Sequence, residues 1–348
     1  MYKKIFMGIA AVAALTLVSC SSDDLNSLSD NSSKNKAISF DGYWGRSAVS
    51  VNGSRGSELN KTALQGLTEG FGVFGNYKEA VGQEFGSNWF DNVQVKYSSK
   101  DTKWTYSPVQ YWLPQGHIDF LAYAPYDSKY DNNQVTNDNQ KLEFTVNSTI
   151  KDQKDLLWAN ATNKTKADKT VTFTFNHALA KIGYSVKTNV VGTGGTTITL
   201  KKITLAGSDT EPATGAFYTK GTIDLSKGNK ATDLWTKQEG KQYFTWFNGS
   251  QSLTSTSESN PKTDYLFVIP QDFSDAASDD LYVIVDYTIT YNTGAEATMT
   301  SKVSKQLKKN FEQGKAYTIN LTIGLTPIEF DAEVAEWGIG DTETIPLN

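Results

Sequence analysis

Few residues in this sequence are suited to chemistry. Its 348 residues include one cysteine, Cys20, and two histidines, His117 and His177. A lone cysteine forms neither an internal disulfide nor a multi-cysteine metal site, and two histidines are too few for a typical zinc or copper centre. No Gly-x-Ser-x-Gly nucleophile elbow occurs, and the glycine run at 192–195 lacks the lysine of a phosphate-binding loop. The pattern predicts no cofactor and no bound metal, and it favours a protein that is not an enzyme.

The position of Cys20 indicates a different chemistry, which is lipidation. Two lysines precede an apolar run at 5–18, which has the length of a signal-peptide core and is short for a membrane-spanning helix. The run ends in Leu17-Val18-Ser19-Cys20, the pattern of a bacterial lipobox. We therefore expect residues 1–19 to be a lipoprotein signal peptide and Cys20 to carry palmitate at the outer membrane. The alternative is an ordinary secretory signal with an incidental cysteine.

Residues 20–36 are rich in Ser, Asp and Asn and nearly free of apolar side chains. Such a segment buries too little surface to offset the entropy of ordering, so it is predicted to be a flexible tether. Its acidic start resembles the signal that sends some lipoproteins to the cell surface, although a plain acidic linker fits as well. The formal net charge of −5 offers no basic patch, and nucleic acid is not expected as a partner.

Beyond the tether, apolar residues recur at every second position in several stretches. This period of two, rich in β-branched and aromatic residues, is typical of strands with one buried face. Turn-rich gaps separate the stretches, and no long segment has helical periodicity. The sequence therefore predicts an all-β protein built from β-sandwiches. The expected strands lie near 70–77, 117–124, 141–146, 171–175, 196–205, 281–291, 317–325 and 328–334.

Several short motifs then follow one another in a distinctive order. They are Tyr111-Trp112, Ile118-Asp119-Phe120-Leu121-Ala122-Tyr123-Ala124-Pro125, Asp155-Leu156-Leu157-Trp158-Ala159, Phe175-Asn176-His177-Ala178-Leu179-Ala180-Lys181-Ile182, Val268-Ile269-Pro270-Gln271, and Gly314-Lys315-Ala316-Tyr317-Thr318-Ile319-Asn320-Leu321, closed by Ile328-Glu329-Phe330 and Trp337. Together, behind a lipobox, this set resembles the fimbrillin-like family of surface lipoproteins from anaerobic Gram-negative bacteria. The resemblance covers nearly the whole chain after the signal peptide.

The resemblance implies two tandem transthyretin-like β-sandwich domains in a subunit of a cell-surface fimbria, or pilus. We expect an N-terminal domain at 37–165 and a C-terminal domain at 166–348, because the polar stretch Asn160–Lys169 lacks large apolar residues. The resemblance also implies cleavage after an arginine by an outside protease, and polymerisation with other fimbrial subunits by strand exchange. The sequence has two arginines, Arg46 and Arg55, both in a Gly/Ser-rich stretch of the kind that is easily nicked.

Cleavage after Arg46 would detach a candidate first strand that contains Ile38 and Phe40, together with Cys20 and its lipid. Loss of one strand from a sandwich exposes an apolar groove and unpaired backbone groups, which can accept a strand from another chain. The candidate donor is the C-terminal region, where apolar residues alternate well. Alternatively, this region simply completes its own domain. The apolar residues of the candidate donor are Ile328, Phe330, Ala332 and Val334.

A second function class is a monomeric surface lipoprotein that binds carbohydrate or host ligands. Exposed aromatic rings stack on sugars, and Tyr243–Phe247 is the candidate strip, although it also fits an ordinary strand with one core face. A calcium ion at Asp131–Asp138 is conceivable, but the spacing and the turn glycine of an EF-hand are missing. Paired carboxylates such as Asp279-Asp280 do not establish glycosidase chemistry, because catalysis depends on their separation in space.

The lipobox makes a direct prediction. Cells that express the full chain should incorporate labelled palmitate into it, and Cys20→Ala should abolish the label, because the mutant has no thiol to modify. Unchanged labelling of Cys20→Ala would place the anchor elsewhere and remove the lipoprotein interpretation.

Overall fold

A computed structural model describes most of the chain from Lys36 onward. In this part of the chain nearly all regular structure is β-strand, so the all-β class expected from the sequence is confirmed. Its helical turns are short, namely α1 (Lys61–Gly66) and a 3₁₀ turn at Ile150–Asp152. The described ranges are 36–44, 61–79, 88–130, 140–190, 195–210, 212–228, 233–259, 265–275, 279–293, 295–325, 329–336 and 342–345.

Seven of the described strands form one sheet, here called the N-terminal sheet. One edge is the first strand of the chain, β1, which runs parallel to its neighbour β8, whereas the other neighbours are antiparallel. In spatial order the strands are β1 (Phe40–Trp44), β8 (Val171–His177), β7 (Leu157–Lys164), β5 (His117–Ala124), β2 (Phe71–Lys78), β3 (Asn88–Ser98) and β4 (Lys103–Thr105).

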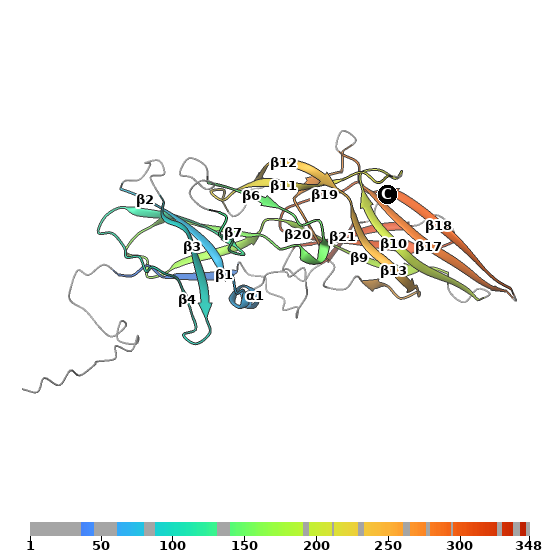
Figure 1. Cartoon of the computed structure of the whole chain (residues 1–348), viewed down its shortest axis with the longest axis horizontal. Coiled ribbons are helices and arrows are strands. Elements are labelled where there is room, and N and C mark those ends of the chain that lie inside the picture. Colours follow the sequence, from blue (N-terminus) through green and yellow to red (C-terminus); the bar gives the residue numbers. More distant parts are fainter. Residues whose placement is uncertain are drawn as a thin grey trace, which may run out of the picture. The chain divides into compact units, whose positions relative to one another are not determined.

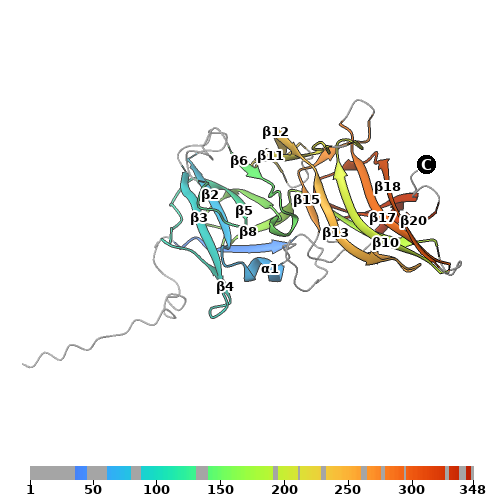
Figure 2. The same ribbon diagram turned by 45° about the vertical axis from the view of Figure 1, so that its right-hand side comes forward.

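The remaining described strands form smaller sheets, and β10, β13, β17 and β18 lie side by side in both views (Figure 1, Figure 2). That four-stranded sheet consists of β13 (Phe244–Ser252), β10 (Thr196–Ala206), β17 (Tyr282–Thr293) and β18 (Ala295–Gln306). A second comprises β12 (Trp235–Gln242), β11 (Phe217–Asp224) and β6 (Lys141–Thr145). A third comprises β14 (Glu258–Ser259), β9 (Ala180–Thr188), β20 (Lys315–Ile323), β21 (Glu329–Glu336) and β22 (Thr342–Ile345), with β15 (Leu266–Val268) also on β9. The last pairs β16 (Gln271–Asp272) with β19 (Asn310–Phe311).

Two clusters of buried apolar residues hold these sheets together. The first core is rich in phenylalanine and is formed mainly by one face of the N-terminal sheet. The second core is larger and is formed mainly by strands from β9 onward. Strand β5 is buried along its whole length because Phe120 and Ala122 face the first core while Leu121 and Tyr123 face the second. This explains the unbroken apolar run Phe120–Ala124, which is typical of a strand covered on both faces.

Several strands lie where the period-two pattern predicts them. The stretches expected at 117–124, 171–175 and 196–205 correspond to β5, β8 and β10. The polar stretch Asn160–Lys169 behaves differently, because β7 continues to Lys164 and the chain then turns into β8 of the same sheet. The expected division into two domains at 165/166 stays a prediction.

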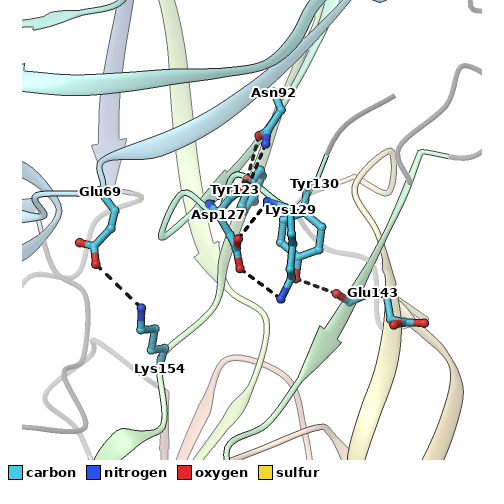
Figure 3. A network of polar contacts seen from close by, with 8 residues as sticks. All are labelled: Glu69, Asn92, Tyr123, Asp127, Lys129, Tyr130, Glu143 and Lys154. Atoms are coloured by element: carbon cyan, nitrogen blue, oxygen red, sulfur yellow. Dashed lines mark hydrogen bonds and ion pairs between the residues drawn. The ribbon is translucent and has the colours of Figure 1, made fainter. Parts of the chain in front are cut away.

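A buried polar network fixes the loop that follows β5 (Figure 3). The Tyr123 hydroxyl lies 2.8 Å from Asn92 Oδ1 and 2.9 Å from the carbonyl oxygen of Asp127, and Asn92 Nδ2 donates to the same carbonyl at 2.9 Å. Further along the loop, the Tyr130 hydroxyl donates to the carbonyl oxygen of Glu143 in β6 at 2.6 Å. The network therefore ties β3 and β5 of the N-terminal sheet to β6, whose own partner is β11.

Burial raises the pKa of both network tyrosines, Tyr123 and Tyr130, because the phenolate would lose most of its solvation. For Tyr123 the hydrogen bonds to Asp127 and Asn92 oppose the shift without cancelling it. Burial likewise raises the pKa of Tyr317 to about 12. These hydroxyl groups therefore stay protonated, and remain hydrogen-bond donors, throughout the physiological pH range.

The raised pKa values predict alkaline instability. A group whose pKa is higher in the folded state than in the unfolded state stabilises the fold. This stabilisation is complete below the unfolded pKa of about 10 and is lost as the pH rises above it. Tyr123→Phe should cost about 1–3 kcal/mol at neutral pH, because it leaves buried polar partners unsatisfied, yet it should flatten the decline above pH of about 10. Urea unfolding across that pH range tests this, with the half-exposed Tyr111→Phe as control. Equal slopes for both variants would contradict it.

Candidate functional site: the groove of the N-terminal segment

The N-terminal segment Lys36–Trp44 is held on both sides by parts of the chain that are distant in sequence. On one side Ile38 N–H donates to the Gln110 carbonyl at 2.8 Å, and Trp112 N–H donates to the Lys36 carbonyl at 2.9 Å. On the other side Val171 N–H donates to the Ser39 carbonyl at 2.8 Å, and β1 then pairs with β8 from Phe40 to Trp44. The start of the segment therefore pairs with the 110–112 strip and the rest of it pairs with β8, and these two partners together are here called the groove of the segment.

Two side chains anchor the segment in the first core. Ile38 and Phe40 are 2% and 4% exposed, whereas Ser39 between them is only half-buried and Asp41 is exposed. The Phe40 ring has four aromatic neighbours, at centroid distances of 5.2–5.7 Å, so its removal would leave a large vacancy in the core. These neighbours are Phe90, Tyr106, Phe120 and Phe173.

The next residue of the segment that faces the core is Gly42, and its surroundings leave room for a Cβ atom. A Cβ atom at this position would lie 3.4 Å from Leu64 Cδ2, 3.5 Å from Trp104 Cζ2 and 3.6 Å from Phe175 Cε2. These are ordinary van der Waals distances, so one methyl group fits and a larger side chain does not. Leu64 belongs to α1, which lies beside the end of β1 in both views (Figure 1, Figure 2).

Tyr106 closes the groove near its start. Its hydroxyl donates to the Ile38 carbonyl oxygen at 2.7 Å and accepts from Gln110 N–H at 3.3 Å. Burial raises the pKa of Tyr106, although its contact with the Gln110 backbone works in the opposite direction. The hydroxyl therefore remains a donor at neutral pH. The hydrogen bonds that join the segment to Gln110, Trp112, Val171 and Tyr106 use its backbone atoms, whereas Ser39 Oγ contacts Lys169 and Thr170 through its side chain.

The candidate donor includes strand β21, which lies between β20 and β22 in its sheet. Strand β21 pairs antiparallel with β20, so that Phe330 lies opposite Leu321, Ala332 opposite Ile319, and Val334 opposite Tyr317. The half-buried Val334 packs against the second core. Strand β22 continues outward from β21. The described part of this region is thus paired within its own chain, in keeping with the alternative that it completes its own domain.

Several sites predicted from the sequence lie outside the described residues. These are Cys20, Arg46, Arg55, Ile328 and the conceivable calcium loop at 131–138. Among the residues that are described, no group of three or more histidine, cysteine or acidic side chains is placed to hold a metal ion. Within the same ranges, no helix has both the length and the apolar character needed to cross a membrane.

The other candidate site residues from the sequence make contacts within the fold. In the strip Tyr243–Phe247, the Phe244 and Trp246 side chains are buried in the second core, and Trp246 packs edge-on against Tyr184. Only Tyr243 presents a well-exposed ring, so the strip is a strand with a core face and not an aromatic platform. His177 Nδ1 lies 2.8 Å from the carboxylate of the buried Asp155, which is a contact within the fold.

Sequence reasoning missed the far wall of the groove. The strip at 110–112 and Tyr106 carry no strand pattern, because Pro108 and Pro114 interrupt the local sequence. Their contacts with Lys36–Ile38 join residues about seventy positions apart, and no local signal encodes such pairing. The placement of Ile38 and Phe40 on one face could, however, be predicted from their spacing alone.

Comparison with known proteins identifies the family. The profile of the fimbrillin-like family matches residues 61–337, and the chain belongs to that family. The structure is similar to a fimbrial protein from Bacteroides vulgatus, with 21% identity, a TM-score of 0.67, and coverage of 87% of this chain and 100% of the other. It is also similar to a candidate cell adhesion protein from Bacteroides ovatus, with 15% identity, a TM-score of 0.51, and coverage of 88% and 100%. At these identities the likeness establishes the fold. A search of curated proteins gave no match.

The burial of Phe40 predicts its energetic weight. Phe40→Ala should lower the free energy of unfolding by about 3–5 kcal/mol, because it removes a ring that four aromatic neighbours enclose. The neighbouring Asp41→Ala, on the exposed side of the same strand, should change it by no more than about 0.5 kcal/mol. Chemical denaturation of both variants provides the measurement. Similar effects of the two substitutions would mean that the segment contributes little to the first core.

Proposed function

We propose that this protein is a structural or adhesive subunit of a cell-surface fimbria and that it assembles by protease-triggered β-strand exchange. Membership of the fimbrillin-like family supports the fimbrial role and favours a structural protein over an enzyme. The observation that carries the mechanism is the N-terminal segment, which fills the first core from the edge of a sheet. Its removal would leave a phenylalanine-lined vacancy beside the edge of β8 that now faces β1, and such an edge is a template for a strand from another chain.

The positions of the two arginines in the sequence support such a trigger. Arg46 follows the last residue of β1 by two positions, and Arg55 precedes the start of α1 by six. A cut after either one would separate the segment from the rest of the body without breaking a described strand. The same cut would separate the body from Cys20 and its lipid, so one event would release the subunit from the outer membrane and prepare its acceptor groove. The partners would be other fimbrial subunits and an arginine-specific protease.

The two cores support a division into two domains. Strand β8 contributes Val171, Phe173 and Phe175 to the first core, so packing favours a boundary just after β8 rather than at 165/166. Strand β6 crosses this division, because Leu142 is buried in the second core and β6 pairs with β11. We propose two β-sandwich domains on this basis. No described feature favours the alternative of a monomeric carbohydrate-binding lipoprotein, since the aromatic strip considered for it packs inward.

Cleavage can be tested on the purified precursor. An arginine-specific protease should release a fragment that ends at Arg46 or Arg55 and leave the remainder folded, after which the cleaved protein should assemble. Arg46→Lys combined with Arg55→Lys keeps the charge but removes both sites, and this variant should remain monomeric under the same treatment. Mass spectrometry and electron microscopy provide the two measurements. Ordered polymers whose subunits still begin at Cys20 would exclude the mechanism.

A further inference from the structure

Strand β18 forms an outer edge of the four-stranded sheet. It pairs with β17 along its whole length without a register shift, and among the described residues no strand pairs with its other side. It contains neither proline nor glycine, and its side chains between 297 and 306 are exposed or half-buried. A long, regular edge of this kind is a template for a strand from another chain.

The middle of this edge is uncharged and carries an exposed apolar side chain. Residues 297–301 include no charged residue, and Met299 at their centre is 56% exposed. Met299 lies opposite Ile289 of β17, which is buried in the second core, so Met299 extends the apolar face of the sheet past its last strand. The lysines that commonly protect edge strands from association occur only further along β18, at 302 and 305.

We propose that β18 pairs antiparallel with β18 of a second copy of this chain, about a two-fold axis that passes beside Met299. Residues 295–303 of the two copies then face one another, and the two four-stranded sheets become one. The contact is isologous, because both copies use the same surface. It needs neither cleavage nor strand exchange, and it goes beyond the proposed function by adding a contact between like subunits. In a filament whose subunits all run in one direction, such a contact joins two filaments.

The charges along β18 select this register. It places Glu296 of each copy opposite Lys302 of the other, and opposite charges that face each other across two strands stabilise the pair. Centring the pair on Lys302 would place that lysine against its own counterpart, which is unfavourable. Centring it on Thr300 or Ser301 avoids the repulsion but leaves Glu296 opposite an uncharged residue.

The threonines on the opposite face of β18 fit the same register. Thr298 lies opposite Thr290 of β17 with the two hydroxyl oxygens 3.2 Å apart, and Thr300 lies opposite Thr288. In the proposed pair, Thr298 of one copy faces Thr300 of the other, so a threonine pair recurs across the junction. Cross-strand threonine pairs that share a hydrogen bond stabilise sheets. The pairing therefore joins apolar residues on one face and hydroxyl groups on the other.

The proposal can be tested on the uncleaved full chain carrying Cys20→Ala, which has no thiol and no site for lipid. Analytical ultracentrifugation should show an equilibrium between monomer and dimer. Glu296→Lys and Lys302→Glu should each weaken the dimer by about fivefold or more, because each variant places like charges opposite each other twice. The control Lys305→Glu lies outside the paired residues and should stay within about twofold of the parent chain.

Mixing the two charge variants gives the sharpest test of the register. Glu296→Lys and Lys302→Glu should form a heterodimer with each other, because both contacts between them again join opposite charges. Failure of the mixture to associate better than either variant alone would overturn the register. A parent chain that stays monomeric up to its solubility limit would overturn the contact itself. Because the chain is uncleaved, both results leave the proposed strand exchange standing.

Cross-linking locates the two-fold axis. In the same background, Met299→Cys should form a disulfide-linked dimer on mild oxidation, because residues directly opposite in an antiparallel pair have Cβ atoms about 5 Å apart, close to the separation that a disulfide requires. Lys305→Cys, which does not lie opposite itself, should remain monomeric. Equal cross-linking at both positions would overturn the proposal.

Discussion

The first core depends on the ring of Phe40, which the first strand of the chain supplies. Phe40 packs against both Phe120 of β5 and Phe173 of β8, and it reaches that position because β1 lies along the sheet edge. Protein interiors are packed as densely as organic crystals, so the core around this vacancy cannot simply collapse to fill it. Loss of β1 would therefore leave a cavity in the first core. The exposed Asp41 on the same strand contributes no such constraint.

The covalent link between β1 and the rest of the body then affects how strongly β1 competes for its place in the core. A segment that is tethered to its binding site competes for it as an intramolecular partner, at an effective concentration that can reach about millimolar. Under the proposed mechanism, a cut between β1 and α1 would leave every hydrogen bond of β1 in place but would remove that advantage. The segment would thereafter compete with free strands on its intrinsic affinity. A protease would then act as a switch without touching any residue of the groove.

Much of this architecture follows from local sequence, and the remainder follows from pairing across long distances. Strand β5 could be predicted from an unbroken apolar run, and β10 from its alternation. Strand β7 was not predicted, because its C-terminal half consists mostly of polar residues that resemble a linker and that form a strand by pairing with β5. Within the groove, the inward face of Ile38 and Phe40 was predictable. The parallel pairing of β1 with β8 was not, because it joins residues about 130 positions apart.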